Sequence, residues 1–378
     1  MILSRIQAGL AAITLLGSAA VASAADDWVY FGTYTDKAGS KGIYRSKFDG
    51  TTGKLSAPEL AAEAPSPSFL AISPNGKFLY AVAETDGKDG GGVLAYALNA
   101  KTGELTKLNQ GTTGGSGPCH ISIHPKGEYA TIANYGGGST AVIKLGSDGK
   151  LGERVGFVQH IGTSADKNRQ EGPHAHCSFF DPKGKYILTV DLGIDRVKVF
   201  TLDPSSGLKE ETEADIVTPP GTGPRHIAIA PDEKFAYVCG ELNSTVNVIE
   251  LGGSGGKNKV VQTLSSLTEP VKGNSTAECI LHPSGKFVYV SNRGHNSIAV
   301  FKVGEDRKLT AVGHITGDIK IPRNFNIDPS GKWMLIASQE GEKVGVWELD
   351  EKTGLGKETG NTVEVSKPVC VKFVPVAK

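Results

Sequence analysis

The feature that most constrains the fold of this chain is a motif that recurs along it: an apolar strand, a proline, a tight turn and a second apolar strand. The first copy runs from Phe69 to Val82. Proline fixes φ at the first central position of a turn, and a glycine two residues later relieves its exit, so each copy predicts a β-hairpin. The anchoring prolines are spaced 46 to 57 residues apart: Pro74, Pro125, Pro182, Pro231, Pro283 and Pro329. A period near 50 residues is typical of propeller blades.

Each hairpin is followed by further strand signals. A third strand is clearest at 197–202, 245–250, 297–302 and 344–349, and a glycine-containing turn and a weaker fourth strand follow it. No long stretch has the period of a helix. Solenoids and sandwiches do not repeat a four-stranded sheet at this spacing, so we expect an all-β propeller with four antiparallel strands per blade.

The two ends of the chain together predict one more blade. Residues 28–34 resemble a second strand and residues 42–48 a third, but no first strand precedes them. The segment Cys370–Pro375 matches the first-strand motif, proline included. We therefore expect a seven-bladed ring that the C-terminal strand closes by joining the N-terminal blade. The 378 residues less the first 24 allow about 51 residues for each blade.

The first 24 residues have the pattern of a Sec-type signal peptide. Arg5 precedes an apolar run, 6–21, which ends in the small residues Ala22–Ala24. The run is short for a membrane anchor, and no later stretch approaches 18 apolar residues. We expect cleavage, a single propeller domain over residues 25–378, a periplasmic or secreted location and no membrane association after cleavage.

Composition adds three constraints. Forty basic residues balance 40 acidic ones, so nothing indicates a nucleic-acid partner. The 49 glycines, about 13% of the chain against a usual ~7%, fit the frequent turns of many short strands. The five cysteines are odd in number and show neither CxxC nor zinc spacing, so we expect small buried residues rather than a disulfide framework.

Polar residues gather at the start of the first strand of each blade, the strand that lines a propeller's channel. Six residues before each proline the chain has Cys119, His176, Arg225, Ala277, Arg323 and Val369. Five residues before it stand His120, Cys177, His226, Glu278, Asn324 and Cys370. A third set follows the second strand: Glu84, Asn134, Asp191, Glu241, Asn292, Arg293, Gln339 and Glu340. All three sets are expected at one channel mouth, either as a catalytic site or as the wall of a water-filled channel.

Several of these segments together resemble a known family. The segments are Gly172–His176, Gly223–His226, Glu241–Val246, Ser291–Gly294 and Pro322–Phe325. In this order they resemble the lactonase family of seven-bladed propellers, which includes propeller-type 6-phosphogluconolactonase and the fungal 3-carboxy-cis,cis-muconate lactonizing enzyme. The resemblance extends from Trp28 to about Pro375.

The resemblance implies an active site at one channel mouth, with no metal and no cofactor. The catalytic groups carried over by motif are His176, Arg225, Glu241 and Arg293, with Arg323 as an alternative to Arg293. The remaining channel-mouth candidates are interpreted as substrate-binding residues: His120, Asp191, His226, Glu278, Arg323, Asn324 and Gln339. A metal is also disfavoured because His174 and His176 would alternate across a strand.

Three functions remain open at this stage. The first is hydrolysis of a sugar lactone by a monomeric exported enzyme, with Glu241 or His176 as general base and Arg225 with Arg293 binding the oxyanion or an anionic substrate group. The second is lactone formation from an unsaturated dicarboxylic acid. The third is a non-catalytic propeller that binds a ligand or protein. The family's sugar-phosphate substrate is cytoplasmic, whereas this chain carries an export signal, and the first-strand site of the second blade, 66–69, has no ionisable group.

Overall fold

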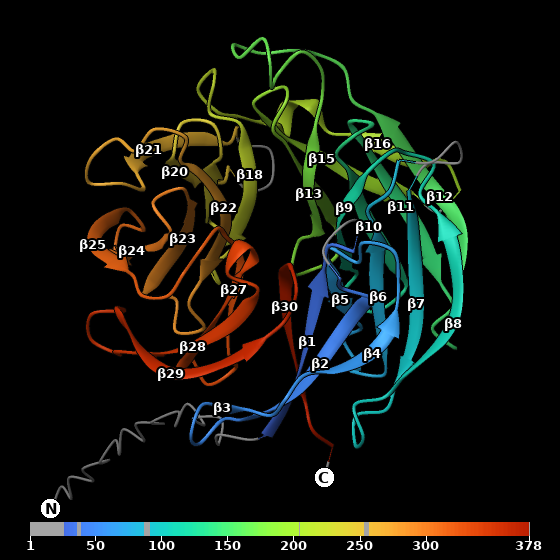
Figure 1. The fold of residues 1–378 in the computed structure, drawn as a ribbon. Helices are drawn as coiled ribbons and strands as arrows, with labels where there is room; N and C mark the ends of the chain where they lie inside the picture. Colours follow the sequence, from blue (N-terminus) through green and yellow to red (C-terminus); the bar gives the residue numbers. More distant parts are fainter. Residues whose placement is uncertain (1–25, 36–38, 87–90, 204, 253–256, 378) are drawn as a thin grey trace, which may run out of the picture.

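The computed structural model describes residues 26–35, 39–86, 91–203, 205–252 and 257–377. Seven antiparallel sheets stand around a central channel, which confirms the expected seven-bladed propeller (Figure 1). The proposed signal peptide, residues 1–24, lies outside the described residues. Within the part of the chain that the structure describes, no helix has the length and apolar character needed to cross a membrane.

Each blade runs outward from an inner strand at the channel. The first blade combines β30 (Pro368–Pro375), β1 (Asp26–Thr33), β2 (Gly42–Asp49), β3 (Lys54–Leu55) and β4 (Glu59–Glu63). The second has β5 (Leu70–Ile72), β6 (Phe78–Ala83), β7 (Gly92–Leu98) and β8 (Leu105–Thr112). The third has β9 (Pro118–Ile123), β10 (Tyr129–Asn134), β11 (Ser139–Leu145) and β12 (Leu151–Gln159). The fourth has β13 (Ala175–Phe180), β14 (Tyr186–Asp191), β15 (Arg196–Asp203), β16 (Gly207–Glu210), the short helix η1 (Thr212–Ala214) and β17 (Ile216–Val217).

The last three blades follow the same plan. The fifth has β18 (Pro224–Ile229), β19 (Phe235–Gly240), β20 (Thr245–Glu250) and β21 (Lys259–Ser265). The sixth has β22 (Ser275–Leu281), β23 (Phe287–Arg293), β24 (Ser297–Val303) and β25 (Leu309–Ile315). The seventh has β26 (Pro322–Ile327), β27 (Trp333–Ser338), the short helix η2 (Gln339–Gly341), β28 (Lys343–Leu349) and β29 (Gly356–Glu364). In the first and fourth blades the outer strand is split in two, as β3 with β4 and β16 with β17.

The ring closes as the sequence predicts. β30 pairs antiparallel with β1 over seven residue pairs, from Asp27 opposite Pro375 to Thr33 opposite Pro368. Both ends of the described chain therefore lie in one blade (Figure 1). Val371 and Cys370 are fully buried, so closure also completes the apolar core between the first blade and its neighbours.

Neighbouring blades are joined by one contact that recurs around the ring. A buried aromatic residue in the second strand of a blade donates a hydrogen bond to a backbone carbonyl in the outer turn of the next blade. Tyr30 Oη donates to the carbonyl of Gly103 at 2.7 Å, and Trp333 Nε1 makes the same kind of contact across the closure, to Gly50 at 2.8 Å. Such a bond satisfies the one polar atom of a side chain that is otherwise packed among apolar residues.

Six of the inner strands, all except β5, carry a β-bulge at their channel-mouth end. In β18 the residues Pro224 and Ile227 pair with Gly240 and Val238, so Arg225 and His226 both lie opposite one residue of β19. The register shifts at the corresponding point of β9, β13, β22, β26 and β30. Because a bulge interrupts strict alternation, it turns two consecutive side chains toward the channel. We call the residue six before the turn proline the bulge position.

The five cysteines are all buried and free, and burial raises the pKa of every one of these thiols. We therefore expect a thiol reagent near neutral pH to leave the native protein unmodified and to modify all five cysteines once the chain is unfolded. Titration of thiols in native buffer and in guanidinium chloride checks this. Recovery of fewer than five thiols from the unfolded, unreduced chain would indicate a disulfide and contradict the prediction.

Candidate active site

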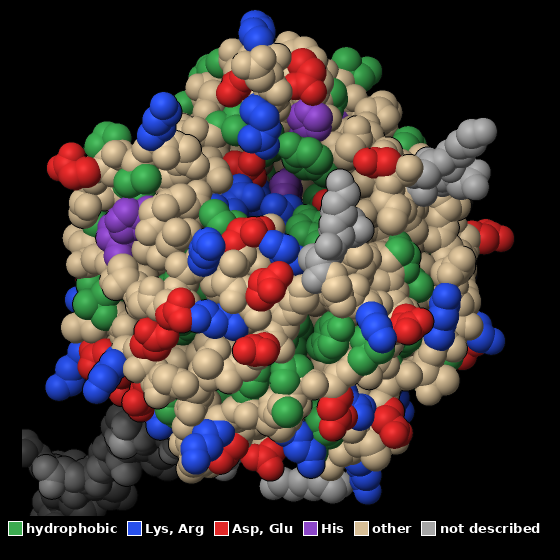
Figure 2. Space-filling model, viewed as in Figure 1, with side chains coloured by type: hydrophobic (Ala, Val, Ile, Leu, Met, Phe, Trp, Pro, Cys, Tyr) green, Lys and Arg blue, Asp and Glu red, His purple; other side chains and the backbone are tan. Residues whose placement is uncertain are grey.

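The bulge positions bring several of the predicted residues into the lining of one pocket, whereas Glu241 and Arg293 are not lining residues. His176, Arg225 and Arg323, from three different blades, line it together with His226 and Asn324. The remaining lining residues are Ser68, Phe69, Glu84, Cys119 and Val369. Figure 2 shows the corresponding hollow at the centre of one face, with basic and histidine side chains at its base.

A second ring of side chains comes from the residue ten after each turn proline, which we call the exit position. Glu84, Tyr135, Glu241 and Arg293 occupy it in four blades. The residues one place earlier are structural, because Asn134, Asp191 and Asn292 are fully buried and Ser338 is 1% exposed. Because side chains alternate between the two faces of a strand, the exit-position residues and the buried residues just before them point in different directions. The sequence analysis had treated these residues as one set.

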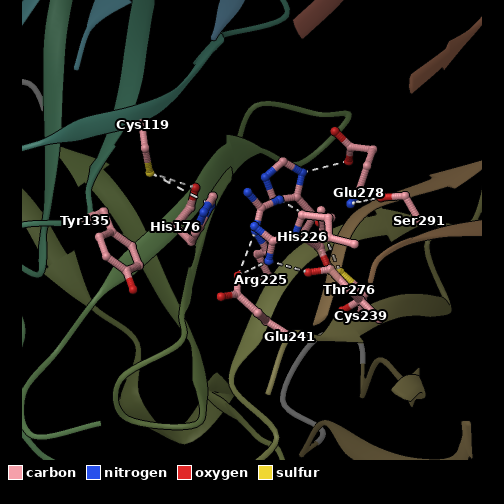
Figure 3. Close-up of polar contacts among 12 residues, drawn as sticks. Cys119, Tyr135, His176, Arg225, His226, Cys239, Glu241, Thr276, Glu278 and Ser291 are labelled. Carbon is pink, nitrogen blue, oxygen red and sulfur yellow. Dashed lines mark hydrogen bonds and ion pairs between the residues drawn. The ribbon is translucent and has the colours of Figure 1, made fainter. Parts of the chain in front are cut away.

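Glu241 is the centre of an arginine cluster, and Figure 3 shows its contact with Arg225. Its Oε2 lies 2.9 Å from Arg225 Nε and 3.0 Å from Arg293 Nη2, and its Oε1 accepts a 2.8 Å hydrogen bond from Arg169 Nη2. The Arg225 contact is an ion pair without hydrogen-bond alignment, since Nε has no hydrogen-bond partner within the described part of the chain. Arg225 is further fixed by a 2.7 Å bond from Nη1 to the carbonyl of Ala277, and Arg293 by a 2.9 Å bond to that of Thr276.

These contacts set the charge of the cluster. Burial alone would raise the pKa of the Glu241 carboxyl, but Arg293, Arg225 and Arg169 lower it to about 2. Glu241 is therefore a carboxylate at any physiological pH. Burial also lowers the pKa of Arg293 to about 10, so this guanidinium keeps its proton near neutrality.

The other exit-position carboxylate, Glu84, lines the pocket itself. Ser68 Oγ donates a hydrogen bond to Glu84 Oε2, and Tyr34 Oη donates to Glu84 Oε1 at 3.3 Å. Glu84 thus supplies the charged group that the first-strand residues of the second blade lack. Arg323 stacks over the Tyr34 ring at 5.3 Å and, among the described residues, has no carboxylate within ion-pair distance.

Three imidazoles meet beneath the arginines. The His226 ring lies 5.3 Å from that of His176 and 5.4 Å from that of His120, measured between centroids. His226 Nδ1 lies 2.6 Å from Glu278 Oε1, as Figure 3 shows. Asn324 Nδ2 donates to the other oxygen of Glu278. His120 and Glu278 line the channel just below the pocket rather than the pocket itself. Among the described residues no cluster of three or more His, Cys, Asp or Glu is placed to hold a metal ion.

Two of the predicted substrate-binding residues lie apart from these clusters. Asp191 is fully buried, pairs with His160 Nδ1 at 2.6 Å and accepts bonds from the backbone of His174 and Gly193. It is occupied in holding the loop before β13. Gln339 begins η2, and its amide donates to Glu340 at 3.1 Å. Neither residue lines the pocket.

Arg169 and Tyr135 are site residues that the sequence analysis missed. Arg169 lies in the loop between β12 and β13, outside the repeated motif, so counting from the prolines gives it no equivalent in other blades. Its Nη2 bridges Glu241 and the hydroxyl of Tyr135, 3.1 Å away. Tyr135 in turn contacts the edge of the His176 ring at 5.4 Å between centroids. Of these two residues, only Tyr135 could have been predicted from the repeat, because it stands ten residues after a turn proline.

The comparison with protein families decides the relationship. The family model described as "Lactonase, 7-bladed beta-propeller" matches residues 28–373. The chain belongs to this family. Among its curated relatives is a 6-phosphogluconolactonase of Bacillus subtilis, 38% identical over 91% of this chain and 97% of the relative. Another is a 6-phosphogluconolactonase of Formosa agariphila, 31% identical over 86% of this chain and 93% of the relative.

Solved structures agree with this membership of the lactonase family. The structure of Pseudomonas aeruginosa periplasmic gluconolactonase is 30% identical, covers 93% of this chain and 100% of its own, and superposes with a TM-score of 0.86. The lactonase-family resemblance inferred from the five motifs is therefore confirmed. The similarity extends over the complete ring, so it includes every blade that contributes a side chain to the pocket.

Proposed function

We propose that this protein is a lactone hydrolase, a carboxylic ester hydrolase that opens a sugar lactone by water attack at the channel mouth, acting as an exported monomer. The observation that carries the proposal is the meeting, in one pocket, of the His176 and His226 imidazoles with the guanidiniums of Arg323 and of Arg225, which pairs with Glu241. The names of the Bacillus and Pseudomonas relatives support the reaction class, and the periplasmic Pseudomonas enzyme supports export. No observation favours lactone formation or a purely binding role.

The guanidiniums provide the electrophilic part of the site. In ester hydrolysis the carbonyl oxygen becomes negatively charged in the tetrahedral intermediate, and preorganised cationic donors stabilise that charge. Arg225 and Arg293 are held rigidly by Glu241 and by backbone carbonyls, so they can bind the oxyanion without reorganising. Four arginines, Arg169, Arg225, Arg293 and Arg323, face the two carboxylates Glu84 and Glu241, and this excess of positive charge favours a substrate with an anionic group.

The proton acceptor is best sought among the imidazoles. Glu241 with a pKa of about 2 is a very weak base, which argues against one of the two candidates from the sequence. His176, the other candidate, is buried in the pocket, and burial followed by the charge of Arg225 holds its pKa well below the usual value. An imidazole that stays neutral at neutral pH has a lone pair free to accept a proton from water.

A panel of aldonolactones tests the proposed function directly. Each lactone is offered with and without a phosphate group, and acid release at neutral pH is corrected for spontaneous hydrolysis. We expect turnover of at least one lactone by the wild-type protein. Absence of turnover across the panel, together with binding of a lactone at the pocket, would favour the non-catalytic function instead.

Arg323→Gln tests which cation holds the substrate's anionic group. Because Arg323 has no carboxylate within ion-pair distance among the residues that the structure describes, we expect the variant to raise KM for a phosphorylated or carboxylated lactone by about 10- to 100-fold, as loss of one charged hydrogen bond implies. The KM for an uncharged lactone should change much less. An equal rise in KM for charged and uncharged lactones would rule out this role. Lys332→Gln, at an exposed ion pair with Glu348, is the matched control for loss of one cation.

A further inference from the structure

We infer that His226, oriented by Glu278, takes the proton from the attacking water and returns it to the leaving alkoxide. This assignment rests on the proposed lactone hydrolysis and adds a residue pair that the family motif does not place among the catalytic groups. His226 lines the pocket, and Glu278 lies behind it in the channel. Glu278 would be a positioning residue, because it acts only through His226.

The hydrogen bonds around Glu278 fix the tautomer of His226. A carboxylate oxygen only accepts, so His226 Nδ1, 2.6 Å from Glu278 Oε1, must carry the hydrogen. The carboxylate itself is held by the backbone N–H of Cys279 at 3.0 Å and by the amide of Asn324. The backbone N–H of Glu278 donates to Ser291 Oγ at 2.9 Å. Of the two ring nitrogens of His226, only Nδ1 has a hydrogen-bond partner among the described residues. The lone pair of Nε2 is therefore not used by a protein donor, and His226 lines the pocket.

His176 lacks this support. Among the described residues its Nδ1 contacts only the sulfur of Cys119, at 3.8 Å. Burial and then the charges of Arg225, Arg323 and Arg293 hold the pKa of His176 well below its usual value. Protonating His176 would place one more cation among Arg225, Arg293 and Arg323. For His226, burial lowers the pKa of the imidazole, but the Glu278 carboxylate opposes the effect. His226 is therefore the stronger proton acceptor of the two.

The surroundings of His226 include titratable or charged groups from several inner strands. Glu278 is the carboxylate in contact with it, and the other titratable or charged groups around it are His120 on β9, His176 on β13, Arg225 on its own strand and Lys372 on β30. Phe69 and Asn324 complete the contact layer. The Glu278 carboxylate is thus the group whose removal should most disfavour the imidazolium.

The proton returns to its starting point within one turnover. As the water oxygen bonds to the lactone carbonyl carbon, one water proton moves to His226 Nε2, and the carbonyl electron pair moves onto oxygen beside the guanidiniums. When the intermediate collapses, the bond between the carbonyl carbon and the ring oxygen breaks. The ring oxygen then takes the proton from Nε2 and becomes a hydroxyl. The new carboxylic acid releases its own proton to solvent, and Glu278 remains a carboxylate throughout.

The decisive measurement is kcat/KM against pH, from about pH 4 to 8, with the lactone that the wild-type protein turns over fastest. His226→Gln should lower kcat/KM by about 100-fold. Glu278→Gln should lower the plateau and also move the acidic limb to lower pH by roughly one unit or more, because an imidazolium without its carboxylate is less stable. His176→Gln should keep the acidic limb in place. His282→Gln, in a hairpin turn where Nε2 contacts Gly331, is the matched control and should match the wild type.

Chemical rescue distinguishes a loss of activity caused by the missing proton acceptor from a loss caused by misfolding. Imidazole added to His226→Gly should restore part of the lost rate, with a dependence on the unprotonated form of imidazole. If His226→Gly fails to fold, as seen by circular dichroism, the pH profile of Glu278→Gln alone decides. An acidic limb unmoved in Glu278→Gln but abolished in His176→Gln would overturn the assignment while leaving lactone hydrolysis intact. A wild-type protein without lactonase activity would instead remove the proposed function itself.

Discussion

Replacing Glu241 with glutamine is expected to lower kcat/KM by about 100- to 1,000-fold, the scale of losing a preorganised oxyanion-binding group. The carboxylate is 5% exposed and is the common anion of Arg169, Arg225 and Arg293. Without it these guanidiniums repel one another, and the geometry that would stabilise the oxyanion is lost. Steady-state kinetics on the best lactone of the panel measures the effect, with Glu340→Gln, at the exposed ion pair to Lys367, as the control.

The same variant should also change stability in a pH-dependent way. The pKa of Glu241 in the folded protein is about 2, below the 4.5 of an unperturbed glutamate. The carboxylate therefore stabilises the folded state fully above pH 4.5, and this contribution disappears as the pH falls toward 2. Linkage gives it a size of about 3 kcal/mol. Urea unfolding at neutral pH should show a loss of this order in Glu241→Gln, and the difference from wild type should shrink at acidic pH.

A difference in stability that stays constant from pH 7 to 3 would show that the carboxylate is not the stabilising group. Unchanged lactonase activity in a folded Glu241→Gln protein would show that the arginines keep their geometry by other means. The backbone carbonyls of Ala277 and Thr276 are the contacts that could do so.

The second large effect is expected from removing the closing strand. A chain that ends at Lys367 lacks β30 and should not form a cooperatively folded propeller. Three of the lost valines, Val369, Val371 and Val374, are at most 3% exposed. Burial of such side chains contributes about 1.5–3 kcal/mol each, a large part of the 5–15 kcal/mol by which a typical domain is stable. Loss of the β1 pairing also exposes a new sheet edge, which favours aggregation.

Size-exclusion chromatography and thermal unfolding followed by circular dichroism test this truncation. A chain that ends at Val376 is the matched control, because it keeps β30 and the hydrogen bond from the Val376 N–H to the carbonyl of Asp26. The control should unfold at nearly the wild-type temperature. A monomeric truncated chain with a wild-type transition would mean that closure is not needed for the ring to be stable.

The repeat made most of the fold predictable from sequence. The proline-anchored hairpin marks six blades, and the match between Cys370–Pro375 and the first-strand motif was enough to place the closing strand. The split of the outer strand in the first and fourth blades was not predictable, because outer strands are short, polar and weakly patterned.

The site was predictable only in part, for reasons of register. Counting from the prolines found the bulge positions, because every one stands the same distance before its turn. At the end of the second strand the count did not separate neighbouring positions. Asp191 stands nine residues after its turn proline and Glu241 stands ten residues after its own. Because successive side chains of a strand point to opposite faces, the Asp191 side chain lies in the core and the Glu241 side chain contacts Arg225. Arg169 belongs to a loop that no repeat constrains, so only the folded structure brings it to Glu241.

The bulges at the channel mouth have a consequence for how new substrate preferences could arise in such a ring. A residue at a bulge is left out of the regular ladder of hydrogen bonds, so exchanging its side chain leaves the pairing of the strands intact. His176, Arg225 and Arg323 each come from a different blade. Their identities can therefore be altered one at a time, and the chemistry of the pocket can diverge while the architecture that presents it is inherited unchanged.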